Sequence, residues 1–213
     1  MLISSYNPRE MGDTLVVILN ADVATQASEQ KGDVVRIFDA QTNQSLGYNF
    51  LNVSKVLENF EGNGQIFLAA DQVTRLNQAL SNAGFEAELT TDNEPKFVVG
   101  YVESMEPHPD SDHLNITTTV VDNGQSVQIV SGSPNMQTGI KVVVAKVGAM
   151  MPDGLVIWPG QLRGVESDGM IVSGREMHIP GAPNKPGAMI LPDSFEVGTP
   201  FDVTSDAAQH IFN

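Results

Sequence analysis

The residues best suited to chemistry lie in one short segment, His108 to His113, with the sequence HPDSDH. This segment places two histidines and two aspartates within six residues, and imidazole and carboxylate groups are good ligands for zinc or manganese. The alternative is a polar loop in which Pro107 and Pro109 set a turn and Asp112 caps it. Because histidines five positions apart in a loop have no assured convergence, we predict a loop and no metal site.

Serine nucleophiles are the second chemical possibility. Ser131, Ser133 and Ser173 have glycine neighbours, but none lies in the Gly-x-Ser-x-Gly turn of the α/β-hydrolases. A triad could still assemble in space, because triads are defined by geometry and not by sequence order. The alternative is that these serines satisfy turns or donate to a ligand. The chain has no cysteine, which excludes a thiolate nucleophile, a thiolate metal site and a disulfide framework. We predict a protein that is not an enzyme and holds no cofactor.

The net charge argues against nucleic acid as a ligand. The chain has 11 basic and 26 acidic residues, a net charge of −15, which repels a polyanion at long range. Dividing the chain between Leu89 and Thr90 gives 5 − 11 = −6 for the first part and 6 − 15 = −9 for the second. An assignment to nucleic-acid binding must therefore rest on specific residues and not on composition.

The length of 213 residues suits one large domain or two small ones. The N-terminus lacks a basic segment followed by a long apolar run, so we predict no signal peptide. No apolar run approaches the roughly 20 residues that a membrane helix needs. We expect a cytoplasmic protein with no membrane segment.

The first half of the chain predicts a small α+β domain over residues 1–92. Asp71 is the predicted N-cap of its helix and Gly84 the residue that ends it. The predicted elements are strands at 14–20, 34–40, 46–53, 65–69 and 85–89, and a helix at 72–83. No phosphate-binding loop, paired histidines or clustered carboxylates occur here, so the sequence leaves the role of this domain open.

The second half, residues 93–213, predicts a β-barrel of the OB-fold type. Turn signals recur every 8 to 12 residues or so, the spacing typical of a small barrel or sandwich. Gly100 interrupts a strand, which indicates a bend or bulge, and 122–124 (DNG) predicts a hairpin turn. The predicted strands are 97–105, 114–121, 126–132, 141–147, 155–159, 162–165 and 169–173. Closed five-stranded barrels need such glycine bends, although periodicity alone leaves a β-sandwich open.

Aromatic residues are few in this half, and Trp158 is the best exposed aromatic candidate for stacking on a base, with a plug at the barrel mouth as the alternative. The lack of an aromatic platform argues against generic single-strand binding. Recognition of a folded RNA by its shape and phosphates needs fewer aromatic residues.

Basic residues are also few. Arg163 and Arg175 lie close in sequence to Ser167 and Ser173, and guanidinium, hydroxyl and exposed N–H groups are the donors that hold phosphates. The ordinary alternative is that these basic side chains lie on the solvent-exposed surface and bind no ligand.

Several segments together resemble a known family. They are VVGYVESMEPHPDSDHLNITTTVVDNG, IVSGSPNMQTGIKVVVAKVGAMMP and LRGVESDGMIVSGREM, within residues 97–201. They resemble the bacterial tRNA-binding domain, which occurs as a stand-alone protein, at the C-terminus of many methionyl-tRNA synthetases and near the N-terminus of the phenylalanyl-tRNA synthetase β chain. The whole chain, a small α+β unit followed by this domain, resembles the YtpR-type tRNA-binding proteins.

The resemblance implies an OB-fold that binds tRNA by its structure rather than by its sequence. It also makes a homodimer one expectation, because stand-alone members of the family can dimerise. The family's motif positions are His108, Pro109, Asp112, His113, Ser131, Gly132, Gly164, Gly169 and Met170. The residues expected to contact tRNA are Asn135, Lys141, Lys146, Arg163, Ser167, Ser173 and Arg175. The net charge favours an alternative, a protein-interaction adaptor that keeps the barrel and binds RNA weakly or not at all.

Overall fold

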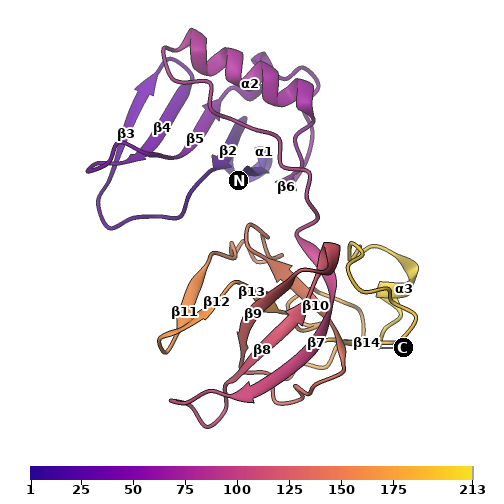
Figure 1. The fold of residues 1–213 in the computed structure, drawn as a ribbon. Helices are drawn as coiled ribbons and strands as arrows, with labels where there is room; N and C mark the ends of the chain where they lie inside the picture. The colour runs from indigo at the N-terminus through magenta and orange to yellow at the C-terminus, as the bar shows by residue number, and fades with distance from the viewer. Residues whose placement is uncertain (213) are drawn as a thin grey trace. The chain divides into compact units, whose positions relative to one another are not determined.

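The computed structural model describes residues 1–212, which separate into two compact units. The first unit is Met1–Glu94, and the second begins at Pro95 (Figure 1). No helix within residues 1–212 has both the length and the apolar composition needed to cross a membrane.

The first unit is an antiparallel sheet with one long helix, α2 (Ala70–Asn82), lying along one side of it (Figure 1). The strands occur in the spatial order β3-β4-β5-β2-β1-β6. Their bounds are β1 (Ile3–Tyr6), β2 (Thr14–Ile18), β3 (Gln26–Lys31), β4 (Val34–Asp39), β5 (Ser45–Leu51) and β6 (Gly64–Ile66). Two short helical segments join them, α1 (Pro8–Met11) and a 3-10 turn at Val53–Lys55.

The core of the first unit forms between α2 and the sheet. Leu76 and Leu80 of α2 are completely buried and belong to one apolar cluster with Leu15 of β2 and Phe50 of β5. A helix with a narrow apolar face on an alternating sheet buries apolar side chains of both elements at once. The α+β architecture predicted for this half is confirmed.

Local predictions for the first unit were partly wrong. The helix begins at Ala70 because the Ala69 N–H donates to the Gln72 side chain at 2.9 Å, so Asp71 lies in the first turn and is not the cap. Residues 85–89 form no strand. The Asn77 side chain instead binds both backbone groups of Leu89, donating to its carbonyl at 2.8 Å and accepting from its N–H at 3.0 Å.

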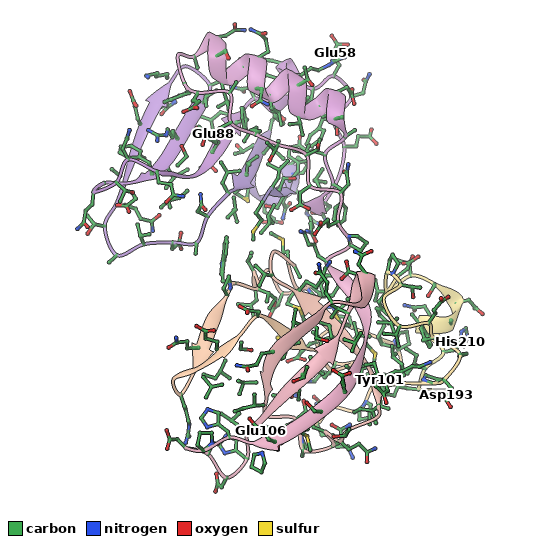
Figure 2. All side chains as sticks on the ribbon, viewed as in Figure 1. Glu58, Glu88, Tyr101, Glu106, Asp193 and His210 are labelled. Atoms are coloured by element: carbon green, nitrogen blue, oxygen red, sulfur yellow. The ribbon has the colours of Figure 1, made fainter. Side chains whose placement is uncertain are left out.

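A polar cluster closes the side of the first unit around Glu88, which Figure 2 marks over the sheet. The carboxylate of Glu88 accepts hydrogen bonds from the hydroxyls of Ser45 and Tyr48, and Arg36 donates from Nε to Ser45 Oγ at 2.8 Å. Burial, and then the hydrogen bond to Glu88, raises the pKa of Tyr48 to about 12. The segment that follows α2 is thereby attached to β5.

The second unit is a nearly closed β-barrel, as predicted. Its main sheet has the order β13-β10-β7-β8-β9, and β9 returns to the segment before β13, where the Asp168 N–H donates to the Gln128 carbonyl at 2.9 Å. The strands are β7 (Phe97–Pro107), β8 (Asn115–Val120), β9 (Ser126–Ser131), β10 (Lys141–Lys146), β11 (Gly160–Leu162), β12 (Val165–Ser167), β13 (Gly169–Ile171) and β14 (Ile190–Leu191). A short helix, α3 (Asp206–Gln209), lies near the end of the described chain.

Strand β10 is buried on both faces, which explains its unbroken apolar sequence. Val142 and Val144 belong to the apolar cluster that contains Val98 and Ile129, whereas Val143 belongs to a second cluster that includes residues of the C-terminal segment, such as Phe201. A strand covered on both sides loses the alternation of apolar and polar residues that a half-exposed strand shows.

Strand β7 contains an irregularity in register close to its interior glycine, which agrees with the predicted bend or bulge. A Cβ atom on Gly100 would lie 2.6 Å from Val144 Cγ2 and 3.0 Å from Thr119 Cγ2, so the neighbouring side chains leave no room for a side chain at this position. The register with β8 shifts two residues later, between Val102 and Ser104. Residues 155–159 form no strand, since only Val156 makes an isolated bridge, to Met150.

Candidate nucleic-acid interface

The HPDSDH loop (108–113) is joined to the tip of the β11–β12 hairpin, and we call these two segments the corner. His108 is 3% exposed. Its Nε2 lies 3.0 Å from the carbonyl oxygen of Leu162, and its Nδ1 accepts from the Asp110 N–H at 3.0 Å. Because a carbonyl only accepts, Nε2 carries the proton and the ring is a neutral imidazole in this arrangement. Arg163 adds a third link by donating from Nη1 to the Asp110 carbonyl at 2.7 Å.

The residues at the tip of the β11–β12 hairpin have backbone angles that fit the sequence of the turn. Arg163 has φ +47° and Gly164 has φ +83°, between the paired residues Leu162 and Val165. Two central residues with positive φ define a type I′ turn, in which glycine is strongly favoured. The turn projects the Arg163 side chain toward the HPDSDH loop, where it makes the bond to Asp110.

Apart from His108 and the Asp110 carbonyl, the HPDSDH loop makes only local hydrogen bonds, and most of it is exposed. His113 Nδ1 lies 2.9 Å from Asp112 Oδ1, and this hydrogen bond is the main reason that the pKa of Asp112 is below its usual value. Pro109 is exposed. His108 binds the hairpin whereas His113 pairs with Asp112, so the two histidines have different partners. Nowhere in residues 1–212 do three metal-ligating side chains gather in a way that could hold an ion.

Ser167 and Ser131 serve the backbone around them. Ser167 Oγ accepts from the Val130 N–H at 3.1 Å and donates to the Gly169 carbonyl at 3.2 Å, which fastens β9 to the β12–β13 connection. Ser131 Oγ accepts from the Ser133 N–H at 3.3 Å. Both side chains are almost fully buried.

The motif residues Gly169 and Gly132 differ in how much room their surroundings leave for a side chain. Gly169 has φ +149°, and a Cβ atom there would lie 3.0 Å from the Ala145 carbonyl oxygen, so a side chain is excluded by both backbone and neighbour. A Cβ atom on Gly132 would lie 3.3 Å from Leu114 Cδ2, a tight but flexible contact. Met170, next to Gly169, lines a cavity.

Asn135 and Ser173 also bind the protein's own backbone. Asn135 donates from Nδ2 to the Ala188 carbonyl at 2.9 Å and accepts from the Ala188 N–H at 2.7 Å. Ser173 and Glu176 form a capping box, in which Glu176 Oε2 accepts from the Ser173 N–H and hydroxyl, each at 2.7 Å, and Ser173 Oγ accepts from the Glu176 N–H at 3.2 Å. These amide and hydroxyl groups are engaged without a ligand.

The two lysines of β10 have internal partners and do not join the arginines. Lys141 Nζ donates to the carbonyl oxygens of Asp193 and Phe195, both at 2.7 Å. Lys146 forms an ion pair with Asp122 at 2.9 Å, with only 15% of the Lys146 side chain exposed. Both ammonium groups are therefore neutralised or hydrogen bonded within the barrel.

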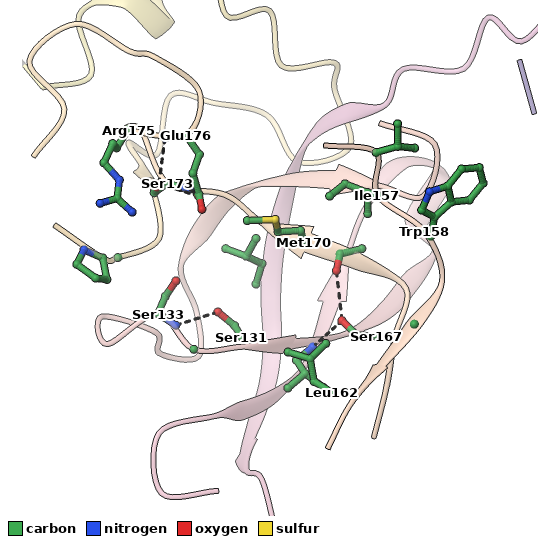
Figure 3. Close-up of a pocket in the computed structure, with 18 residues that line it drawn as sticks. Ser131, Ser133, Ile157, Trp158, Leu162, Ser167, Met170, Ser173, Arg175 and Glu176 are labelled. Carbon is green, nitrogen blue, oxygen red and sulfur yellow. Dashed lines mark hydrogen bonds between the residues drawn. The ribbon is translucent and has the colours of Figure 1, made fainter. Parts of the chain in front are cut away.

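Two adjoining cavities lie beside the capping box, and Figure 3 shows the residues that line the first of them. The first has a volume of about 410 Å³ and the second about 370 Å³, and they share Ser173, Pro186 and Gly187 as lining residues. Arg175 lines the first and Lys185 the second. Both side chains are exposed, and within residues 1–212 neither forms an ion pair or donates a hydrogen bond. We call Arg175, Glu176 and Lys185 the rim.

The predicted contact residues are thus divided by the structure. Arg175 lies at the rim, and Figure 3 shows its side chain and that of Glu176 pointing toward the Ser133 side of the first cavity. Trp158 lines the same cavity, but its ring points away from the serines. Ser167 and Ser173 line the cavity while bound to the backbone, and Arg163 lies at the corner.

Sequence reasoning did not assign Glu176 or Lys185 to the site. The Ser-x-x-Glu spacing of Ser173 and Glu176 is a capping-box signature that could have located the first of them. Lys185 lies in a loop rich in proline and glycine, 180–187, for which no spacing rule places a side chain at a cavity.

Comparison with known proteins gives matches over both units. Residues 97–200 match the family described as "Putative tRNA binding domain", and residues 21–92 match a "Domain of unknown function (DUF4479)". The chain is 44% identical over 197 residues to the "Putative tRNA-binding protein YtpR" of Bacillus subtilis (strain 168), which covers 92% of this chain and 97% of that protein.

Shorter matches join the chain to the β subunit of phenylalanine–tRNA ligase. Identity is 41% over 128 residues with the subunit of Neisseria meningitidis and 38% over 131 residues with that of Staphylococcus aureus. These matches cover 59% and 60% of this chain but 16% of each subunit. The similarity is therefore to one domain of a much longer protein.

Proposed function

We propose, from the premise that the chain belongs to the YtpR-type family of proteins with a tRNA-binding domain, that it binds tRNA without catalysing a reaction. We also propose that the rim of its barrel makes the contact with the tRNA. The domain match and the relative that spans nearly the whole chain support the ligand class. The location rests on the structure of the barrel itself.

The observation that carries the proposal is the unpartnered state of Arg175 and Lys185. Guanidinium and ammonium groups are the side chains that bind phosphates, and these two have no internal partner among the described residues. In contrast, Lys141 and Lys146 already bind carbonyl and carboxylate oxygens. A phosphate at the rim would gain a partner without breaking an existing bond.

The negative net charge is compatible with this location. The linings of the two cavities contain Arg175 and Lys185 and, within the described part of the chain, Glu176 as their only acidic residue. Charges farther away than about 8 Å are largely screened at physiological ionic strength. The two linings therefore contain two basic residues and one acidic residue, whereas the whole second unit has 6 basic and 13 acidic residues, 6 − 13 = −7. Phosphate contacts carry no base information directly, which agrees with recognition of tRNA by its structure.

The test is tRNA binding by fluorescence anisotropy over a series of salt concentrations. We expect the affinity of the full chain to fall with salt, and the removal of one phosphate-binding side chain should reduce the logarithmic slope by about 0.7 to 0.9. Arg175→Gln and Lys185→Gln should each weaken binding and reduce the slope. Arg75→Gln, which removes an exposed arginine from α2 of the first unit, is the matched control and should change neither. No binding at low salt would contradict the proposal.

The proposal includes a homodimer in the cytoplasm. Its support is the resemblance of residues 97–201 to the stand-alone tRNA-binding domain, some members of which dimerise. Light scattering on the purified chain should give twice the monomer mass of 22.9 kDa. A monomer mass at every concentration would remove the dimer and leave tRNA binding untouched.

A further inference from the structure

The first cavity has an apolar floor, with serine hydroxyls on more than one side of it and the charged groups of Arg175 and Glu176 together at one side (Figure 3). Its volume of about 410 Å³ lies within the range of about 300 to 1,000 Å³ typical of small-ligand sites. Val130, Ile157, Met170 and Ile171 supply apolar lining. A phosphate has no partner on such a surface, whereas the face of a nucleobase gains from contact with apolar and thioether groups. The floor is therefore suited to a planar ring.

Glu176 supplies an acceptor at the side of this floor. Its Oε2 accepts two of the three hydrogen bonds of the capping box, and its Oε1 has no hydrogen-bond partner among residues 1–212. The capping box fixes the side chain, so Oε1 is held in a defined position at the cavity. A free carboxylate oxygen repels phosphate and attracts N–H donors. This group is unexpected in a pure phosphate site and is explained by a ligand that brings a donor.

We propose that the 410 Å³ cavity receives one unstacked RNA base that has an exocyclic amino group, with the amino group on Glu176 Oε1 and a backbone phosphate on Arg175. The inference rests on the proposed function and specifies which part of the RNA the site takes. Unpaired nucleotides in loops and at ends can be turned out of the stack, which is how proteins commonly reach base edges in RNA. Carboxylates accept hydrogen bonds from the amino group of cytosine in this way.

The chemistry of the carboxylate sets the preference among bases. Cytosine and adenine present an amino group on the edge that meets Glu176, whereas uracil presents one N–H between two carbonyl oxygens. Those oxygens face a carboxylate unfavourably, because both groups are acceptors only. Cytosine and adenine should therefore bind better than uracil.

The second cavity continues the path of the nucleic acid. It adjoins the first at Ser173, Pro186 and Gly187 and adds Lys185. A strand whose base occupies the first cavity would place a neighbouring phosphate within the reach of this long, flexible side chain. The site thus fits an unpaired segment of RNA better than a regular duplex.

The experiment compares RNA hairpins that share one stem and differ only in a loop of cytidines, adenosines or uridines. All three have the same number of phosphates, so differences in affinity report the bases and not the charge. We expect the full chain to bind the cytidine and adenosine loops roughly fivefold or more tighter than the uridine loop. In Glu176→Gln the ratio should fall toward one, because an amide can also donate to uracil. Glu166→Gln, an exposed change on β12, should retain the ratio.

The wild-type ratio decides whether the site prefers bases with an amino group, whatever the stability of the Glu176 variant. Equal affinities for the three loops, with tRNA binding retained, would overturn the base site and leave the proposed function in place. A ratio unchanged in a folded Glu176→Gln would overturn the role of Glu176. Failure of tRNA and of all three hairpins to bind would overturn the base site and the proposed function together.

Discussion

The corner and the rim of the barrel each contain an arginine, but the two arginines differ in what they bind. At the corner, His108 and Arg163 are fastened to the backbone of Leu162 and Asp110. At the rim, Arg175 forms no hydrogen bond or ion pair through its side chain within the described residues. The comparison indicates that the histidine and the first arginine of the motif build the barrel, while the second arginine is available to a ligand.

This difference separates stability from binding. Removing a corner side chain breaks bonds within the folded chain, whereas removing a rim cation breaks none. Variants of the corner should therefore lower the stability of the fold, whereas variants of the rim should lower the affinity for tRNA. The largest effect is expected at the corner.

Replacing His108 should have the largest effect of these variants, and this effect is a decrease in the free energy of unfolding. His108→Ala removes two hydrogen bonds from a nearly buried site, and groups left unsatisfied in such sites cost about 1–3 kcal/mol. Urea unfolding of the full chain should show this decrease in the transition of the barrel. His113→Ala, an exposed change in the same loop, should stay within about 0.5 kcal/mol of the wild type. Equal effects of the two variants would contradict the distinction between them.

The first unit has its own closed polar cluster, and it should respond to alkaline pH. The pKa of Tyr48 is raised to about 12, so the neutral hydroxyl is favoured in the folded state. This contribution to stability is complete below the ordinary pKa of about 10 and is lost as the pH rises toward 12. Ultraviolet titration of tyrosinate should show a component near pH 12 that Tyr48→Phe removes. If Tyr48→Phe removed a component near pH 10 instead, the buried hydrogen bond to Glu88 would be contradicted.

The lysines of β10 provide a direct contrast with the rim. Because Lys141 Nζ is held by two carbonyl oxygens, Lys141→Gln should leave tRNA affinity and its salt slope nearly unchanged. Arg175→Gln should change both. Anisotropy titrations under identical conditions compare the two. A larger decrease in affinity for Lys141→Gln would mean that the lysine leaves its internal partners to reach the RNA.

The smallest effect is expected in the exposed part of the HPDSDH loop. The hydrogen bond from His113 lowers the pKa of Asp112, so its contribution is present above the ordinary carboxyl pKa and is lost as the pH falls through the lowered value. His113→Asn should return the pKa of Asp112 toward its usual range, measured by NMR titration of the carboxyl carbon. An unchanged pKa would show that the pair does not persist in solution.

The sequence predicted the architecture well where apolar patterns are strong. The barrel, the α+β unit and the family followed from alternation, turn residues and ordered motifs. Strand β3 was missed because its sequence, QASEQK, is polar along an edge of the sheet and shows no apolar alternation. Residues 155–159 were assigned to a strand because they are apolar, yet they supply Ile157 to a core as a loop.

The binding site was harder to predict, because the hydrogen-bond partners of its polar side chains lie far away in the sequence. The partners of Lys141 lie 52 and 54 residues away, and those of Asn135 lie 53 residues away. No local spacing reveals that these polar groups are already bound. The charge count has the same weakness, because it sums over positions that the fold separates.

The most direct test of the account is the tRNA affinity of the double variant Arg175→Gln/Lys185→Gln measured over a salt series. The account predicts a marked decrease in affinity and a salt slope reduced by about 0.7 to 0.9 for each cation removed, with an unchanged urea midpoint. A wild-type affinity and slope in the folded double variant would contradict the claim that the rim binds the tRNA.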